Sequence, residues 1–174
     1  MSDGEGEAEQ LKDVMRVYPQ GVTVITTSIN GSLYGMTASS FTSVSLQPPL
    51  ILVAISKSTK LHEVFTSARV FAVNLLAEDQ KSVSDRFAGR ENVKDRFKGI
   101  KFDLVEGCPI IKGVRAYLLC SIWSTYEAGD HTLLLGQVMK GAKVSNRRPL
   151  AYYQQQYATI AQLESGEPVP ELNW

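Results

Sequence analysis

Residues 21–40 read GVTVITTSINGSLYGMTASS and carry the clearest fold signal in the chain. Two runs rich in Val, Ile and Thr flank Asn30-Gly31, a dipeptide that suits the positive φ angles of a type I′ turn. The stretch therefore predicts a β-hairpin. Beyond it, LILVAIS (Leu50–Ser56) and VFAVNLL (Val70–Leu76) lack polar alternation, which is typical of strands covered on both faces.

Two longer β patterns occur later in the chain, VRAYLLCSIWSTYEAG and TLLLGQVMKGAKV. They flank Asp130-His131 and predict a second hairpin with this dipeptide at its tip. Together the patterns give six or seven strands joined by hairpins, with helices inserted between them. We therefore expect a mainly β domain with helices, built as a closed or nearly closed antiparallel barrel.

Four segments predict helices. Residues 8–18 place apolar side chains at helical spacing, predicting an amphipathic helix that ends at Pro19 and packs on the rest of the protein. A second helix is expected over Lys60–Ala68, with Ser58 or Thr59 as its N-cap. The polar residues 77–99 favour one or two short helices. The last predicted helix is short and aromatic, around Tyr152, Tyr153 and Tyr157.

A length of 174 residues fits one domain, which we place at 1–162, with 1–9 as a flexible acidic leader and 163–174 as a separate tail. Eighteen basic and eighteen acidic residues cancel, which argues against binding to nucleic acid or anionic membranes. No apolar run approaches the ~20 residues that span a bilayer. We expect a cytoplasmic protein that acts on small molecules.

Several common sites are not indicated. Cys108 and Cys120 lack C-x2-C spacing and are interpreted as packing residues. His62 and His131 lie in no cluster of metal ligands, so no metal is expected. No GxGxxG follows a predicted strand, so a nucleotide would have to bind in a way that differs from a Rossmann fold.

The stretch GMTASSFTSVSLQPPL (Gly35–Leu50) is the first candidate binding segment. It surrounds one aromatic residue with small hydroxyl side chains, namely Thr37, Ser39, Ser40, Thr42, Ser43 and Ser45. Such side chains let a flat ring approach the backbone and can donate hydrogen bonds to carbonyl or phosphate oxygens. The alternative is an ordinary strand whose alternate residues face water.

The segment SKSTK (Ser56–Lys60) stands where a strand passes into a predicted helix. Amide groups at a helix N-terminus favour an anion, and the hydroxyl and lysine side chains add donors and positive charge. The segment is a candidate phosphate-binding site, although ordinary helix capping explains the same residues. His131 in its turn could hydrogen-bond a ligand or guide a proton, or simply be solvated.

These motifs together resemble the short-chain flavin reductases that supply reduced flavin to two-component monooxygenases. The resemblance covers roughly residues 10–160 and rests on ordered features: GVTVITT, GMTASSFTSVSLQPPL, SKST, FAVNLLAEDQ, RFAG, GDHTLLLGQV and PLAYY. It implies an FMN-binding split barrel that works as a homodimer with flavin near the subunit interface. It also implies oxidation of NADH or NADPH with FMN or FAD as acceptor, and a monooxygenase partner that receives the reduced flavin.

The resemblance also assigns site residues. The strand lining the flavin would comprise Met36, Thr37, Ala38, Ser39, Ser40 and Phe41. Phosphate and ribityl contacts would come from Ser56, Lys57, Ser58, Thr59 and Lys60. Asn74 would add a polar contact, Phe87 would border the ring and Tyr152 would complete the pocket. His131 would lie on the nicotinamide side, with no covalent catalyst.

Two other functions remain open at this point. One is a flavin-dependent reductase of ferric chelates, which would share the flavin half-reaction. The other is a split-barrel protein that binds flavin without turnover. Neutral hydroxyl contacts suit a flavin that must leave after reduction, because tight uniform binding would slow release without speeding the hydride step.

Overall fold

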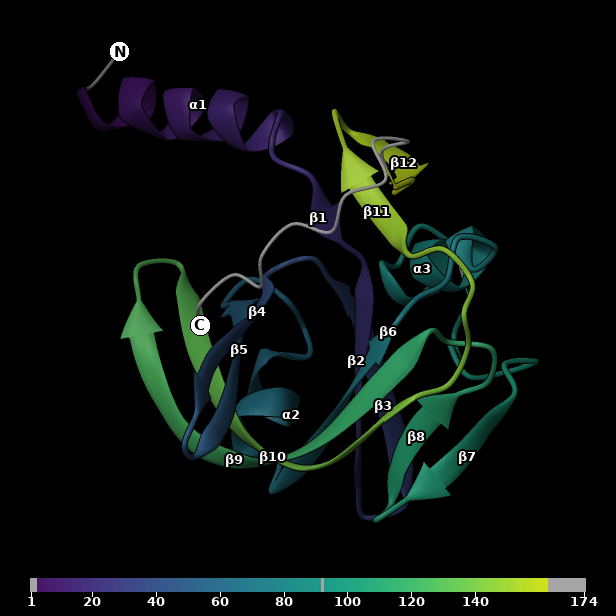
Figure 1. The fold of residues 1–174 in the computed structure, drawn as a ribbon. Coiled ribbons are helices and arrows are strands. Elements are labelled where there is room, and N and C mark those ends of the chain that lie inside the picture. The colour runs from purple at the N-terminus through teal and green to yellow at the C-terminus, as the bar shows by residue number, and fades with distance from the viewer. Residues whose placement is uncertain (1–2, 92, 163–174) are drawn as a thin grey trace.

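The predicted hairpin lies at one edge of the main sheet in the computed structural model, which describes residues 3–91 and 93–162 (Figure 1). β2 (Thr23–Ile29) pairs antiparallel with β3 (Ser32–Ala38) along its whole length. Asn30 and Gly31 between them have φ angles of 51° and 79°, as a type I′ turn requires. The first expectation is confirmed.

Seven antiparallel strands form this sheet in the order β3-β2-β6-β9-β10-β5-β4. The further strands are β4 (Phe41–Leu46), β5 (Pro49–Ser56), β6 (Val70–Leu75), β9 (Ala116–Ala128) and β10 (His131–Lys143). The sheet curves strongly (Figure 1), but its edge strands β3 and β4 do not pair with each other. The fold is therefore a split antiparallel barrel, and the expected class is confirmed.

The barrel interior is packed with apolar side chains from opposite walls. Phe71, Val53 and Leu134 are fully buried in one cluster with Phe65, which α2 (His62–Ser67) contributes. Gly136 on β10 is required here, because a Cβ atom at this position would lie 2.6 Å from the Phe71 ring. Truncating such a phenylalanine to alanine typically costs about 3–5 kcal/mol.

The two buried strands differ in how they are covered. β6 is buried from Phe71 to Asn74 without alternation, which confirms coverage on both faces. β5 instead alternates between buried residues, such as Val53, and half-buried ones, such as Leu52. Its expected coverage on both faces is wrong, since an unbroken apolar run does not reveal which face the rest of the chain will cover.

Two small sheets flank the barrel. β7 (Phe102–Val105) and β8 (Cys108–Ile111) form a hairpin that the sequence did not reveal. The other sheet contains β1 (Gln20–Gly21), β11 (Leu150–Tyr153) and β12 (Gln156–Thr159). The aromatic helix expected here is wrong. Gln154 and Gln155 adopt positive φ angles, which make a tight turn that stacks Tyr152 across from Tyr157.

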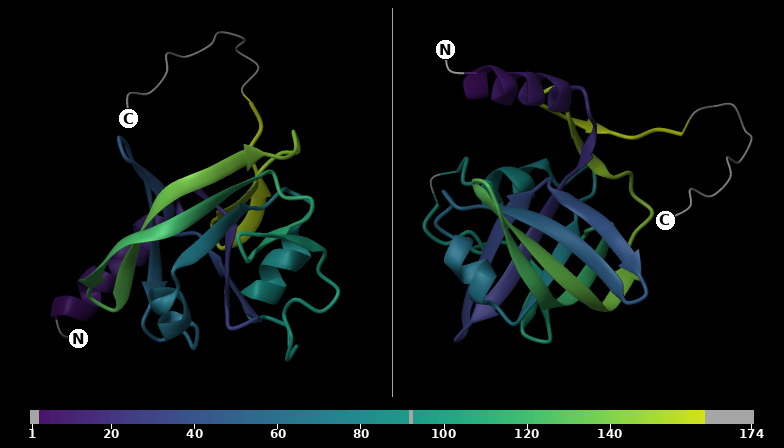
Figure 2. Two further views of the ribbon diagram at one scale, coloured as in Figure 1. Left: turned by 90° about the horizontal axis from the view of Figure 1, so that it is seen from below. Right: turned by 90° about the vertical axis from the view of Figure 1, so that its left-hand side faces the viewer.

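The N-terminal helix α1 (Asp3–Arg16) projects away from the barrel (Figures 1 and 2). It covers residues 8–16 of the segment predicted as an amphipathic helix but ends at Arg16, before Pro19, and it begins inside the segment expected to be a flexible leader. Leu11 and Val14 on its apolar face are 63% and 64% exposed. The expectation that this helix packs on the rest of the chain is wrong within one copy of the protein.

The remaining helices are short. α2 starts at His62 rather than at Lys60, and α3 (Lys81–Phe87) confirms one short helix in the polar segment. Leu61 occupies the N-cap position of α2 without a side-chain bond, so capping by Ser58 or Thr59 is wrong. The amide groups of His62 and Thr59 bond instead to the carbonyls of Thr59 and Ser56, which forms turns before the helix.

Some further expectations concern the whole chain. None of the described helices is long and apolar enough to cross a membrane, and the cytoplasmic location stays a prediction. Cys108 and Cys120 are free and buried, which confirms them as packing residues. The expected tail at 163–174 lies outside the described residues.

Candidate functional site

Two hollows lie beside β3, and Ala88 lines both of them. The lysine hollow, about 540 Å³, includes Tyr34 and Gly35 of β3, Thr59 and Lys60 of the turn after β5, and Lys94 and Arg96. The tyrosine hollow, about 280 Å³, includes Thr37, Ser39, Ser84, Arg90, Tyr152 and Tyr157. One ligand of suitable length could therefore contact β3 and reach the turn after β5.

Gly35 explains how the chain after α3 comes to border both hollows. A Cβ atom at Gly35 would lie 2.6 Å from the ring of Phe87, so glycine lets this ring pack directly on β3. The Thr37 hydroxyl donates a hydrogen bond to the Ser84 carbonyl oxygen (2.7 Å). Arg96 donates to the carbonyl oxygens of Phe87 (2.8 Å) and Gly35 (3.4 Å). These contacts fix Ala88 between the hollows.

The link from β3 to β4 is held against β5. Ser40 donates from its hydroxyl to the Ala54 carbonyl oxygen (2.7 Å), and the Ala54 amide donates to the Ser40 carbonyl oxygen (3.3 Å). Ala38 is buried, and Met36 and Phe41 pack as half-buried side chains on the barrel core. Within Met36–Phe41, Thr37 and Ser39 are the residues that line a hollow.

The turn at Ser56–Lys60 lies beside the tip of the β9–β10 hairpin. Ser56 is the register partner of His131, and the Lys57 amide donates to the Asp130 carbonyl oxygen (2.9 Å). The hydroxyls of Ser56 and Ser58 are 2.8 Å apart. The Lys57 ammonium is bound to Glu127 (2.6 Å) and to the Gly129 carbonyl oxygen (2.8 Å). Within the turn, Thr59 and Lys60 line the lysine hollow.

His131 is the first residue of β10, and its side chain is 40% exposed. Its Nδ1 atom lies 2.8 Å from Asp130 Oδ1. Because an ionised carboxylate only accepts hydrogen bonds, Nδ1 carries the hydrogen and Nε2 is the acceptor of the neutral ring. The same hydrogen bond holds the pKa of Asp130 below its usual range.

Tyr152, one of the expected site residues, lines the tyrosine hollow. Its neighbour Tyr157 was not among the site residues expected from the sequence. The Tyr157 hydroxyl donates to Asp85 Oδ1 (2.8 Å) and lies 2.9 Å from Ser84 Oγ, and burial raises its pKa. Arg90 also bonds to Asp85 (2.9 Å), which raises the pKa of Arg90. These contacts join the β11–β12 hairpin to α3.

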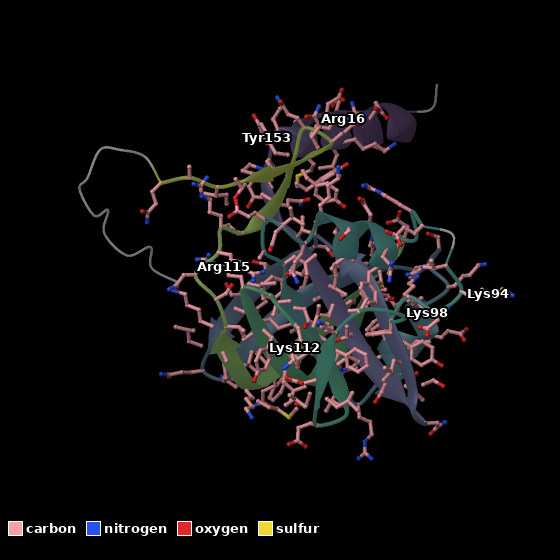
Figure 3. The ribbon with its side chains drawn as sticks, turned by 90° about the vertical axis from the view of Figure 1, so that its right-hand side faces the viewer. Arg16, Lys94, Lys98, Lys112, Arg115 and Tyr153 are labelled. Carbon is pink, nitrogen blue, oxygen red and sulfur yellow. The ribbon has the colours of Figure 1, made fainter. Side chains whose placement is uncertain are left out.

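The face in Figure 3 shows two features around these hollows. Lys94 and Lys98 extend outward from the loop after α3. Arg16 and Tyr153 mark the place where α1 meets the β11–β12 hairpin, and the Gln154 amide donates to the Arg16 carbonyl oxygen there (2.9 Å). Within residues 3–91 and 93–162, no three His, Cys, Asp or Glu side chains gather into a possible metal site.

A family model described as "Flavin reductase like domain" matches residues 15–161, which include the barrel and both hollows. The chain belongs to the flavin reductase like family. A "Probable flavin reductase" of Rhizobium meliloti is 47% identical over 130 residues, 74% of this chain. The chain spans only 41% of that relative's length, and 56% of the length of another relative from the same organism.

Other relatives match this flavin reductase like chain over most of their length. The "4-hydroxyphenylacetate 3-monooxygenase, reductase component" of Thermus thermophilus is 37% identical, covering 87% of this chain and 96% of the relative. A solved NADH:FAD oxidoreductase of Streptomyces globisporus, in complex with NAD and FAD fragments, superimposes with a TM-score of 0.84. It is 35% identical and covers 93% of this chain and 96% of that one.

Two of the expected site residues of this flavin reductase like domain are enclosed by the protein. Asn74 is fully buried, and its amide bonds to the backbone of Val24 and Ile111 and to the Thr26 hydroxyl, so it has no free atom for a ligand. Phe87 is 1% exposed and stacks edge to face on Phe97. Phe87 supports Gly35 of the lysine hollow from behind, whereas Asn74 joins the main sheet to the β7–β8 hairpin.

Lys94, Arg96, Arg90 and Tyr157 line the hollows, but the sequence interpretation did not include them. They belong to the polar segment after α3 and to the C-terminal hairpin. The only signal for them was the nearby RFAG motif, because their approach to β3 depends on contacts between distant parts of the chain.

Proposed function

We propose that this protein is an NAD(P)H:flavin oxidoreductase that reduces FMN or FAD and releases the product. The reaction is NAD(P)H + flavin + H⁺ → NAD(P)⁺ + reduced flavin. The observation that carries the proposal is the pair of hollows along β3, which share Ala88 as a lining residue and offer hydroxyl and lysine side chains, in a chain that belongs to this family. Both rings carry the redox chemistry, so the protein supplies binding, orientation and exclusion of water.

The flavin ring is proposed to lie along the Met36–Phe41 segment, with its phosphate near Ser56–Lys60. Thr37 and Ser39 offer neutral hydroxyl groups at the tyrosine hollow. Thr59, Lys60 and Lys94 offer donors and positive charge at the lysine hollow. The phosphate is therefore bound by side chains and not by the end of α2, which is only six residues long. Exposed contacts of this kind allow the flavin to leave.

His131 is proposed to contact the nicotinamide. The turn places it beside Ser56, and its hydrogen bond to Asp130 fixes the ring orientation and the tautomer. Its Nε2 atom can then accept a hydrogen bond from a group such as the nicotinamide amide. The side chain would orient the donor ring without forming a covalent bond.

We also propose that the protein is a homodimer. The apolar side chains of Leu11 and Val14 on α1 and of Tyr18 just after it are 63%, 64% and 59% exposed, and a second copy would cover them. Light scattering during size-exclusion chromatography tests this, with twice the chain mass expected. A monomer mass at micromolar concentration would contradict it.

The reduced flavin is proposed to pass to a monooxygenase component, as the name of the Thermus relative suggests for that protein. Release can be tested without the partner. Under anaerobic conditions and with excess NADH, the protein should reduce many equivalents of FMN per chain. Reduction that stops at one equivalent would instead indicate a flavin that stays bound.

The central test is flavin-dependent nicotinamide oxidation. Purified protein is mixed with NADH or NADPH and with FMN, FAD or riboflavin in air, and the loss of nicotinamide absorbance is followed at several flavin concentrations. We expect a rate that saturates with flavin. No flavin-dependent oxidation would leave the chain as a flavin-binding protein, whereas a rate that needs a ferric chelate would identify a chelate reductase.

A further inference from the structure

A chain of hydrogen bonds crosses the base of the β9–β10 turn. His62 Nε2 lies 2.8 Å from Thr132 Oγ1, and Thr132 Oγ1 lies 3.0 Å from Glu127 Oε1. The other carboxylate oxygen, Glu127 Oε2, lies 2.6 Å from the Lys57 ammonium. Four side chains from α2, β10, β9 and the turn after β5 are thus linked in series.

The direction of these hydrogen bonds follows from the chemistry of the groups. The Glu127 carboxylate only accepts, so the single hydroxyl hydrogen of Thr132 is donated to it. Thr132 must then accept from His62, whose Nε2 carries a hydrogen. The Lys57 ammonium donates to the second oxygen of Glu127, and this bond lowers the pKa of Glu127. Every link has one donor and one acceptor.

Thr132 is the buried link of this chain, with 2% of its surface exposed. A buried hydroxyl that loses its partners is costly, whereas an exposed ion pair such as Lys57–Glu127 contributes little by itself. The threonine should therefore dominate the energy of the network. Glu127 and Lys57 then fix the direction in which the hydrogen bonds of the network are donated.

The network holds the residues on both sides of His131. Thr132 follows His131 and is bound to His62 and Glu127. Asp130 precedes His131, and its carbonyl oxygen accepts from the Lys57 amide (2.9 Å). The Lys57 ammonium also binds the Gly129 carbonyl oxygen. The backbone of His131 is thus fixed relative to the Ser56–Lys60 turn.

We propose that Thr132 and Glu127 are positioning residues for nicotinamide oxidation, holding His131 at a fixed place beside the turn that receives the flavin phosphate. This inference rests on the proposed function, because it assumes that His131 contacts the nicotinamide. Lys57 accordingly serves the site as a link between turn and hairpin and not as a phosphate ligand.

Thr132→Val and Thr132→Ser form the decisive pair of variants. Valine keeps the shape and removes the hydroxyl, and we expect the KM for NADH to rise about fivefold, as loss of a buried hydrogen bond implies. The KM for flavin should stay within about twofold, because Thr59 and Lys60 are untouched. Serine should restore the wild-type KM. Thr125→Val, on the exposed part of β9, is the control and should leave both constants unchanged.

Glu127→Gln and Lys57→Met test the exposed links, where loss of folding is not a concern. Each should raise the KM for NADH by about twofold, and the double variant should add little to either single one, because both remove one interaction. Fully multiplicative effects would overturn the network, as would a Thr132→Val protein with an unchanged KM for NADH. If the Thr132→Val protein does not fold, the KM values for NADH of the Glu127→Gln and Lys57→Met variants decide whether the network positions His131.

The two proposals can fail separately. A wild-type protein that oxidises no nicotinamide overturns the proposed function and this inference with it. An active wild type whose Thr132→Val, Glu127→Gln and Lys57→Met variants all keep the KM for NADH overturns the positioning role alone. Equal rises in the KM values for flavin and NADH would indicate general loosening of the barrel and would also contradict it.

Discussion

Asn74 is buried between the main sheet and the β7–β8 hairpin, and Lys60 lies in the turn after β5. Both are polar residues near strand ends, but their surroundings differ. Asn74 is fully buried, and both ends of its amide are bonded to protein atoms, including the Ile111 amide at 2.8 Å. Lys60 is exposed and lines the lysine hollow with Thr59. A buried amide must be fully paired, because an unpaired one would cost about 1–3 kcal/mol.

The buried polar residues therefore serve the stability of the fold, and the exposed ones are available to bind small molecules. Buried polar groups such as Asn74 and Thr26 use their hydrogen bonds to join β2 and β6 to the β7–β8 hairpin. Rim groups such as Thr59, Lys60 and His131 keep atoms available for small molecules. Substitutions of these buried groups should therefore change the free energy of unfolding, and substitutions at the rim should change Michaelis constants.

The largest effect is expected for Asn74→Leu. The change leaves the Ile111 amide and the Val24 carbonyl without their side-chain partner, and should lower the free energy of unfolding by about 2–4 kcal/mol. Urea denaturation followed by circular dichroism measures this. The KM for flavin of the folded protein should be unchanged, and a large rise in that constant with normal stability would reverse the assignment of Asn74.

Lys60→Met should act on binding alone. Loss of a charged donor to phosphate should raise the KM for FMN about tenfold, and should leave the KM for riboflavin, which has no phosphate, nearly unchanged. Lys98→Met removes an exposed lysine outside the hollow and is the matched control. If FMN and riboflavin are affected equally, Lys60 does not contact the phosphate.

His131→Ala should have a smaller effect, on the other substrate. Removing one partly exposed hydrogen-bonding group should raise the KM for NADH about fivefold and leave the affinity for flavin unchanged. Steady-state rates at saturating FMN measure the KM for NADH, and a flavin fluorescence titration measures the affinity for flavin. An unchanged KM and rate for NADH would remove His131 from the site.

The smallest effect is expected at the two thiols. Burial raises the pKa of Cys108 to about 11 and that of Cys120 to about 12. At pH 8 both are therefore protonated and shielded, and a thiol reagent should label neither in the native protein. Both should react in urea, where the pKa values return to their ordinary range. Rapid labelling of the native protein would contradict the packing role.

The sequence anticipated the hairpins at Asn30-Gly31 and Asp130-His131, because turn residues and β-branched runs act locally. It missed the hairpin at Glu106-Gly107 and mistook the one at Gln154-Gln155 for a helix. Both glutamines adopt positive φ angles, for which glutamine has no preference of its own. Pairing with β1 and packing on α3 are what stabilise that turn.

The sequence by itself determined a mainly antiparallel barrel, its hydroxyl-rich strand and its lysine-bearing turn, since these follow from spacing and residue type. Only the tertiary structure decided which polar residues are available to a ligand. Asn74 and Phe87 are enclosed, Lys57 is bound to Glu127, and Lys60 and His131 remain open. Burial depends on which distant segments pack together, and no local pattern encodes that.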